Sequence, residues 1–282
     1  MNPKFDELQG KVAVVTGGGG VLCSTMAQAL ADQGAKVAIL DLKIENANAV
    51  ADQITASGGN AIGVEANVLQ LESLKRAHKE VLEQLGPCDI LINGAGGNHP
   101  KGTTSKPHLE LSDLTGNEEL TTFFDLDPEG VQFVFNLNFI GSLLPTQIFA
   151  KDMVGREGCS ILNVSSMNAF TPLTKIPAYS GAKAAVSNFT QWLAVHFSKV
   201  GIRVNALAPG FFLTEQNRTL LTTSSGDLTP RGNTIIEHTP MGRFGDPEDL
   251  TGTLLWLCSN GSRFVTGVVV PIDGGFSAFS GV

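Results

Sequence analysis

Short apolar runs rich in β-branched residues alternate with longer stretches of helical periodicity along most of the chain. In the first half this pattern predicts strands over 11–16, 36–41, 61–66 and 89–93, and helices over 22–32, 44–57 and 71–85. The second half adds helices over 131–151, 178–199 and 247–259, and strands over 159–165, 203–208 and 268–273. This alternation predicts the α/β class, with a doubly wound, mainly parallel sheet and helices on both faces.

Two long, polar and turn-rich segments, at about 98–130 and 211–245, interrupt the alternation. Each follows a predicted strand, at the edge where open α/β sheets bind ligands. Long loops in compact domains are usually lids or binding elements, and inert surface insertions are the alternative. We therefore expect a single domain over 1–282, with these two segments as substrate loops.

Composition narrows the range of partners. Lys and Arg number 19 against 27 Asp and Glu without a basic cluster, so neither nucleic acid nor a membrane is an expected partner. Charged residues form only 16% of the chain, which favours a surface partly covered by other subunits. The four cysteines lie far apart, without disulfide or metal-site spacing, and are interpreted as buried thiols. The first ten residues are polar, and no later run approaches the ~18 apolar residues that span a membrane. We therefore expect a cytoplasmic protein.

A glycine-rich turn at 16–23 follows the first predicted strand and leads into a helix. Gly17, Gly19 and Gly20 would let the backbone approach a pyrophosphate at the positive end of that helix. Asp41 ends the next strand, where a carboxylate can accept hydrogen bonds from both adenosine ribose hydroxyls and would repel a 2′-phosphate. This favours NAD(H). NADP(H) is not excluded, because Lys43 lies two residues after Asp41 and could weaken the preference. The alternative role of Asp41 is to cap a helix.

A tyrosine and a lysine stand four residues apart in the predicted helix 178–199, which puts Tyr179 and Lys183 on one helical face. A phenol needs a nearby positive charge to act as a base at neutral pH, and Lys183 with an oxidised nicotinamide can supply it. Ser166 follows a predicted strand upstream. Tyrosine and lysine at this spacing recur by chance, but with the serine, the glycine turn and Asp41 they predict an oxidoreductase site.

Together these features resemble the short-chain dehydrogenase/reductase family over nearly the whole chain, which implies a Rossmann-like NAD(P)-binding domain. Segments 8–17, 93–96, 209–214 and 272–275 carry further likeness. The resemblance implies that Asn138 completes a catalytic tetrad with Ser166, Tyr179 and Lys183 through a water-linked proton relay. The cofactor contacts expected from the motifs and the resemblance are Gly17, Gly19, Gly20, Leu22, Asp41, Leu42, Asn67, Val68, Asn93, Gly94, Ala95, Tyr179, Lys183, Pro209, Gly210, Phe212 and Thr214.

The phosphate loop departs from the family pattern. Val21 and Cys23 stand where the family has glycines, at unchanged length, and Gly94 stands where it has a second asparagine. The loop positions need small size or permissive backbone geometry. We therefore expect the helix to lie slightly farther from the strand and the pyrophosphate contacts to differ.

The long segment that begins at Gly97 bears on the substrate. With the 16–23 loop, it resembles D-mannonate oxidoreductases (fructuronate reductases) of the same family, which implies a sugar-acid substrate oxidised at its C5 hydroxyl. A hexonate pocket should offer a cation and several polar groups. The candidates for substrate contacts are Ser166, His99, Lys101, Arg218, Arg231 and His238.

Two other functions stay open. One is a reductase for another sugar acid, a polyol or an oxoacyl substrate, such as gluconate 5-dehydrogenation. The other is a non-catalytic NAD-binding sensor, against which the presence of Ser166, Tyr179 and Lys183 argues. The low charge and the resemblance imply a homotetramer, and no metal is expected.

Overall fold

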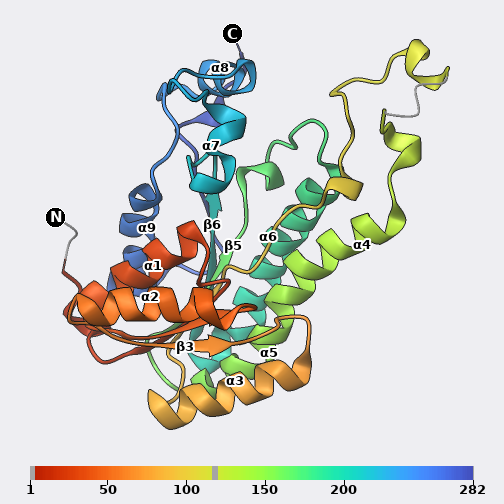
Figure 1. The fold of residues 1–282 in the computed structure, drawn as a ribbon. Coiled ribbons are helices and arrows are strands. Elements are labelled where there is room, and N and C mark those ends of the chain that lie inside the picture. The colour runs from red at the N-terminus through yellow and green to blue at the C-terminus, as the bar shows by residue number, and fades with distance from the viewer. Residues whose placement is uncertain (1–3, 116–119, 282) are drawn as a thin grey trace.

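The computed structural model describes residues 4–115 and 120–281. Seven parallel strands form one sheet in the order β3-β2-β1-β4-β5-β6-β7 (Figure 1). The strands are β1 (Val12–Thr16), β2 (Lys36–Asp41), β3 (Asn60–Glu65), β4 (Ile90–Asn93), β5 (Cys159–Val164), β6 (Ile202–Pro209) and β7 (Val269–Ile272). The predicted doubly wound α/β class is confirmed.

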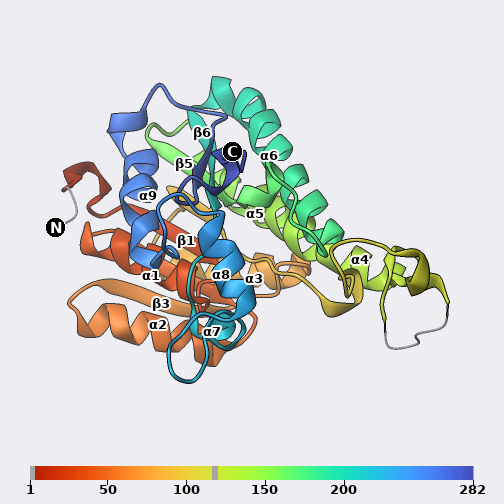
Figure 2. The same cartoon turned by 90° about the horizontal axis from the view of Figure 1, so that it is seen from above.

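Helices cover both faces of the sheet (Figures 1 and 2). The helices are α1 (Val21–Asp32), α2 (Ile44–Ala56), α3 (Leu71–Gln84), α4 (Pro128–Phe135), α5 (Gly141–Met153), α6 (Pro177–Phe197), α7 (Glu215–Leu221), α8 (Pro230–Glu237) and α9 (Thr251–Cys258). One apolar core contains residues of α1, α2 and α9, and a second contains residues of α3, α5 and α6. Strand residues alternate between these two cores, as expected for a sheet buried on both faces.

The order of the strands reverses beside β1. The chain runs outward through β2 and β3 and then returns to β4, so β1 pairs with both β2 and β4. Thr16 and Asn93 lie in register at the carboxyl ends of β1 and β4. The glycine turn and the 94–97 segment therefore begin side by side, at the switch point where open α/β sheets bind ligands.

The sequence predictions for two helical segments were wrong. The helix expected to begin at 131 begins at Pro128, because Asp127 caps it and proline is well suited to the first helical turn. The segment expected to be a loop over 211–245 contains α7 and α8, which begin at capping threonines. Each has fewer than nine residues, which is too short for an apolar period to be evident.

One helical stretch, 128–153, is long and apolar enough to cross a membrane by length and composition, contrary to the sequence expectation. It joins α4 and α5 through a π-helical turn at Asn136–Ile140. Half of its most apolar window is buried within the protein, and α5 packs against α3 and β4. These contacts are those of a core helix.

Candidate active site

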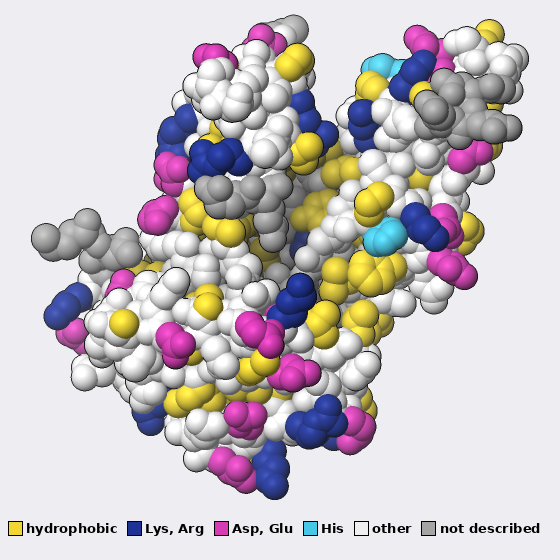
Figure 3. All heavy atoms as spheres, viewed as in Figure 1, with side chains coloured by type: hydrophobic (Ala, Val, Ile, Leu, Met, Phe, Trp, Pro, Cys, Tyr) yellow, Lys and Arg dark blue, Asp and Glu magenta, His cyan; other side chains and the backbone are white. Residues whose placement is uncertain are grey.

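A groove opens at the carboxyl edge of the sheet. It lies between the lobe of α7 and α8 and the lobe formed by α4 and the described part of the 98–130 segment (Figure 3). A cavity of about 400 Å³ at the glycine turn is lined by Gly17, Gly19, Gly20, Val21, Leu22, Cys23, Asp41, Asn46, Gly94, Ala95, Gly96 and Thr214. Eight of the residues expected to contact the cofactor are in this lining.

The glycine turn has no room for side chains at Gly17 and Gly19. A Cβ on Gly17 would lie 2.8 Å from Cα of Ala95, and a Cβ on Gly19 would lie 2.6 Å from Cβ of Asn46. Gly17 also has φ of 63°, a conformation that favours glycine. Gly20 caps α1 without a side-chain hydrogen bond, so the first N–H groups of this helix stay available for an anion.

Asp41 lies at the end of β2, directly beside the turn. Its Oδ2 accepts a hydrogen bond from the Gly19 N–H at 3.1 Å, and its Oδ1 accepts one from the Lys43 N–H at 3.1 Å. A carboxylate has further lone pairs, so these two bonds leave acceptor capacity for ribose hydroxyls.

Two of the three departures from the family pattern, Cys23 and Gly94, compensate each other. A Cβ on Gly94 would lie 2.2 Å from Sγ of Cys23 and 2.8 Å from the Thr16 carbonyl oxygen. The thiol that replaces a glycine in α1 therefore occupies space that a side chain at 94 would need. Burial raises the pKa of Cys23 to about 12, so the thiol acts here as a small apolar group.

Tyr179 and Lys183 meet Ser166 where β5 ends and α6 begins. The Ser166 hydroxyl lies close enough to the Tyr179 hydroxyl to lower its pKa, and Nζ of Lys183 lies 5.6 Å from the centre of the tyrosine ring. Lys183 is 4% exposed, and its Nζ donates to the Val164 carbonyl oxygen at 2.7 Å. The structure thus brings together the three residues that the sequence predicted as a group.

Burial changes the proton affinities of this group. Burial raises the pKa of Tyr179 above its ordinary value, and the hydrogen bond from Ser166 lowers it in part. Burial lowers the pKa of Lys183 to about 8. The expectation that Lys183 lowers the tyrosine pKa is therefore not met by the protein's own groups, because desolvation outweighs the other effects.

Asn138 is fully buried in the π-helical turn. Its Nδ2 donates to the carbonyl oxygens of Val134 and Gly97 at 2.8 Å, and its Oδ1 accepts from the Gly97 N–H at 3.2 Å. A Cβ on Gly96 would lie 2.6 Å from this Oδ1 and 3.1 Å from Nζ of Lys183. Asn138 therefore lies beside Lys183 and also fastens the start of the long segment.

Other residues expected at the cofactor serve the fold with their side chains. Asn93 is 1% exposed and donates to Thr146 Oγ1 in α5 and to Asn163 Oδ1 in β5. Asn67 Oδ1 accepts from the Leu69 N–H. Val68 packs against Gly141, and Leu42 is largely exposed.

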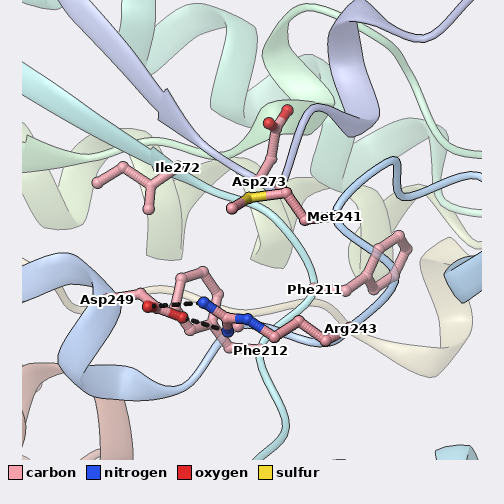
Figure 4. A pocket seen from close by; sticks show the side chains of 9 residues that line it. Phe211, Phe212, Met241, Arg243, Asp249, Ile272 and Asp273 are labelled. Carbon is pink, nitrogen blue, oxygen red and sulfur yellow. Dashed lines mark hydrogen bonds and ion pairs between the residues drawn. The ribbon is translucent and has the colours of Figure 1, made fainter.

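The segment after β6 borders a separate cavity of about 180 Å³. Pro209 ends β6, and the Gly210 N–H donates to the Ile272 carbonyl oxygen at 2.9 Å. The Phe212 ring is buried against Gly245, which has no space for a Cβ. Figure 4 shows the ion pair of Arg243 and Asp249 on one side of this cavity.

The candidate substrate contacts do not converge on one point. His99 Nδ1 accepts from the Lys101 N–H, and Nζ of Lys101 pairs with Asp127 at 2.8 Å. Arg218 and Arg231 are exposed on α7 and α8. His238 Nδ1 bonds to the Thr234 carbonyl oxygen. Of these candidates, only Ser166 lies in the Tyr179 group.

Sequence reasoning missed several residues that shape the groove. Asn46 lines the cavity at the glycine turn, and Thr16 Oγ1 accepts from the Gly94 N–H at 3.1 Å and the Ala95 N–H at 3.3 Å. Thr16 begins the glycine-rich turn and could have been found there as a hydroxyl at a strand end. Asn46 lies inside a helix without any distinguishing pattern.

Several known proteins are similar to this one in sequence. The pattern of the short chain dehydrogenase family matches residues 11–224. The uncharacterized oxidoreductase UxuB of Bacillus subtilis is 53% identical over 283 residues, covering 100% of each chain. A 2-dehydro-3-deoxy-D-gluconate 5-dehydrogenase of Formosa agariphila is 30% identical, covering 100% of this chain and 98% of its own.

A solved structure is also similar. It is a crystal structure with bound NAD of a Haemophilus influenzae protein for which D-mannonate oxidoreductase activity has been proposed. That protein is 58% identical to this chain, with a TM-score of 0.92 and 98% of each chain covered.

Proposed function

Because this chain belongs to the short-chain dehydrogenase family, we propose that it is an NAD-dependent oxidoreductase that interconverts D-mannonate and D-fructuronate. The observation that carries the oxidoreductase chemistry is the grouping of Ser166, Tyr179 and Lys183, in which the Ser166 hydroxyl acts on the pKa of Tyr179 and Lys183 lies beside the tyrosine ring. The group lies at the carboxyl edge of the sheet, close to the glycine turn.

The residues around the glycine turn suit a dinucleotide. The turn excludes side chains at Gly17 and Gly19, the first N–H groups of α1 are free of a side-chain cap, and Asp41 offers acceptors for ribose hydroxyls. A negative charge at Asp41 disfavours a 2′-phosphate, which supports NAD(H). The NAD-bound Haemophilus structure supports the same choice.

Ser166, Tyr179 and Lys183 divide the proton chemistry. In the oxidative direction, Ser166 donates a hydrogen bond to the substrate oxygen, and Tyr179 as the phenolate removes the hydroxyl proton. Bound NAD⁺ supplies the hydride acceptor and a positive charge. Lys183 holds the nicotinamide ribose, and with that added charge it stabilises the phenolate. Asn138, beside Lys183, helps to connect the proton to solvent.

Two observations support a sugar-acid substrate. The Haemophilus protein, at 58% identity, carries the proposed D-mannonate activity, and the Formosa relative is named for another sugar acid. The second observation makes a gluconate-type substrate the alternative. The first weighs more, because its identity to this chain is almost twice as high.

Steady-state turnover across a substrate panel tests the proposal. The panel contains D-mannonate, D-gluconate and the uncharged D-mannitol, each with NAD⁺ and NADP⁺. We expect the highest kcat/KM for D-mannonate with NAD⁺. Faster oxidation of D-gluconate would reject the substrate, and NADH binding without turnover of any compound would favour the non-catalytic sensor.

We also propose a cytoplasmic homotetramer. The low charge content is matched by exposed apolar side chains on α6, where Trp192 is 56% exposed and Val195 is 77% exposed. Large exposed apolar side chains close together are typical of covered surfaces. Light scattering tests the assembly, and a monomeric mass would contradict it.

A further inference from the structure

Lys175 has an unusual backbone conformation. Its φ is 72°, and no other non-glycine residue within 4–115 and 120–281 has a positive φ. Residues with a Cβ avoid this region because the Cβ crowds the backbone, and such strain concentrates at functional sites. Lys175 lies in the loop between Ser166 and Tyr179, two residues before α6 begins.

The long segment 98–130 holds this turn in place. The Thr104 N–H donates to the Lys175 carbonyl oxygen at 2.8 Å. A Cβ on the neighbouring Gly102 would lie 3.4 Å from Cβ of Ala178, in ordinary contact with the start of α6. Residues of the long segment after Gly97 therefore support the backbone conformation of Lys175.

The Lys175 ammonium differs from its lysine neighbours in its partners. Lys101 pairs with Asp127, and Lys106 pairs with Glu110 and Asp113. Lys175 is half-buried, and its ammonium makes no ion pair or hydrogen bond with the described part of the chain. It is thus a cation four residues before Tyr179 with its charge uncompensated by those residues.

We propose that Lys175 binds the carboxylate of the sugar-acid substrate, an inference that rests on the proposed function. A hexonate separates its carboxylate from its C5 hydroxyl by four carbon–carbon bonds. The group that binds the carboxylate must therefore lie near the tyrosine without touching the reacting carbon. Lys175 lies on the turn that leads into α6, four residues before Tyr179, and a substrate carboxylate would supply the partner that its ammonium lacks.

Three variants separate charge from backbone conformation. Lys175→Met removes the charge and keeps a Cβ, Lys175→Arg keeps the charge, and Lys175→Gly removes both charge and strain. Lys106→Met is the matched control, because it removes an ion-paired lysine from the supporting segment. The substrates are D-fructuronate and D-fructose, which carries a hydroxymethyl group in place of the carboxylate.

The expected result is specific to the acid. Lys175→Met and Lys175→Gly should lower kcat/KM for D-fructuronate roughly 10- to 100-fold, mainly through KM, as for a lost hydrogen bond to a charged group. Lys175→Arg should stay within about fivefold of the wild type. In the Lys175 variants, turnover of D-fructose and the NADH affinity measured by fluorescence should be unchanged. The Lys106→Met variant should keep the wild-type kcat/KM for D-fructuronate.

Two outcomes would overturn the inference. One is an unchanged KM for D-fructuronate in Lys175→Met, and the other is wild-type activity in Lys175→Gly, which would leave only a backbone role. A wild-type enzyme that rejects D-fructuronate but reduces another keto acid would instead contradict the proposed substrate. The same variants on that acid would then still test Lys175.

Discussion

The floor of the groove, formed by the glycine turn, Gly94 and the group of Asn138, Ser166, Tyr179 and Lys183, differs from its insertion wall in how polar side chains are held. On the floor, Asn138 is 0% exposed and Lys183 is 4% exposed, and both bond to backbone carbonyls of the surrounding elements. In the insertion wall, formed by the described part of 98–130, the side chain of Lys101 is 60% exposed and that of Lys106 is 41% exposed. These lysines pair with carboxylates of the same segment.

The difference separates chemistry from selectivity. Buried groups on the floor have few conformations and shifted pKa values, which suits proton transfer. Exposed ion pairs in the wall contribute little individually and are easily exchanged. Substitutions in the wall should therefore disturb the protein less than substitutions on the floor, and the hydrogen bond of Thr104 with Lys175 joins the wall to the turn before α6.

Removal of the tyrosine hydroxyl should have the largest effect. Tyr179→Phe deletes the proposed proton acceptor while keeping the ring, so kcat should fall by at least ~10². NADH affinity, measured by fluorescence titration, should stay near the wild-type value. A wild-type rate in this variant would remove the floor's catalytic role.

A side chain at position 94 should disturb the floor next. Gly94→Asn places a Cβ where Cys23 Sγ and the Thr16 carbonyl oxygen already lie, and overpacking of this kind costs about 1–3 kcal/mol. NAD affinity, measured by calorimetry, should fall roughly ten- to hundredfold. The double variant Cys23→Gly/Gly94→Asn should recover part of this loss, and a double variant no better than Gly94→Asn would show that the two positions are not coupled.

Burial of Lys183 should appear in the pH dependence of stability. Its pKa is about 8 in the folded protein and near its ordinary 10.5 when unfolded, so between these values the unfolded chain binds more protons. The unfolding free energy should therefore rise with pH across this window in the wild type relative to Lys183→Met, by about 2 kcal/mol from pH 7 to pH 10. Denaturant titrations measure it, and parallel profiles for the two proteins would contradict the buried charge.

The smallest effect is expected in the wall. Lys101→Met removes an exposed lysine that is already paired with Asp127, so kcat/KM for D-mannonate should change less than about threefold. Steady-state kinetics measures this value, and the same measurement on Lys175→Met allows the two variants to be compared directly. A larger loss in Lys101→Met would restore Lys101 as a substrate contact and weaken the distinction between floor and wall.

Much of the floor could be predicted because its signals are local. Helical spacing puts Tyr179 and Lys183 on one face of α6, and the glycine turn follows a strand directly. The substrate contacts could not be predicted in the same way. In the sequence, Lys101 and His99 were candidates for substrate contacts, but in the folded wall Lys101 pairs with Asp127 and His99 bonds to the Lys101 N–H. The positive φ of Lys175 could not be predicted, because lysine rarely adopts this conformation.

By itself, the sequence determined the alternation of the seven strands with the longer helices, the glycine turn and the helical spacing of Tyr179 and Lys183, because each depends on periodicity or short spacing. Only the tertiary structure decided that Cys23 fills the space beside Gly94, that burial raises the pKa of Tyr179, and that Thr104 bonds to Lys175. These facts depend on contacts between segments up to about 70 residues apart along the chain. Such contacts exist only once the sheet has brought its carboxyl edge together.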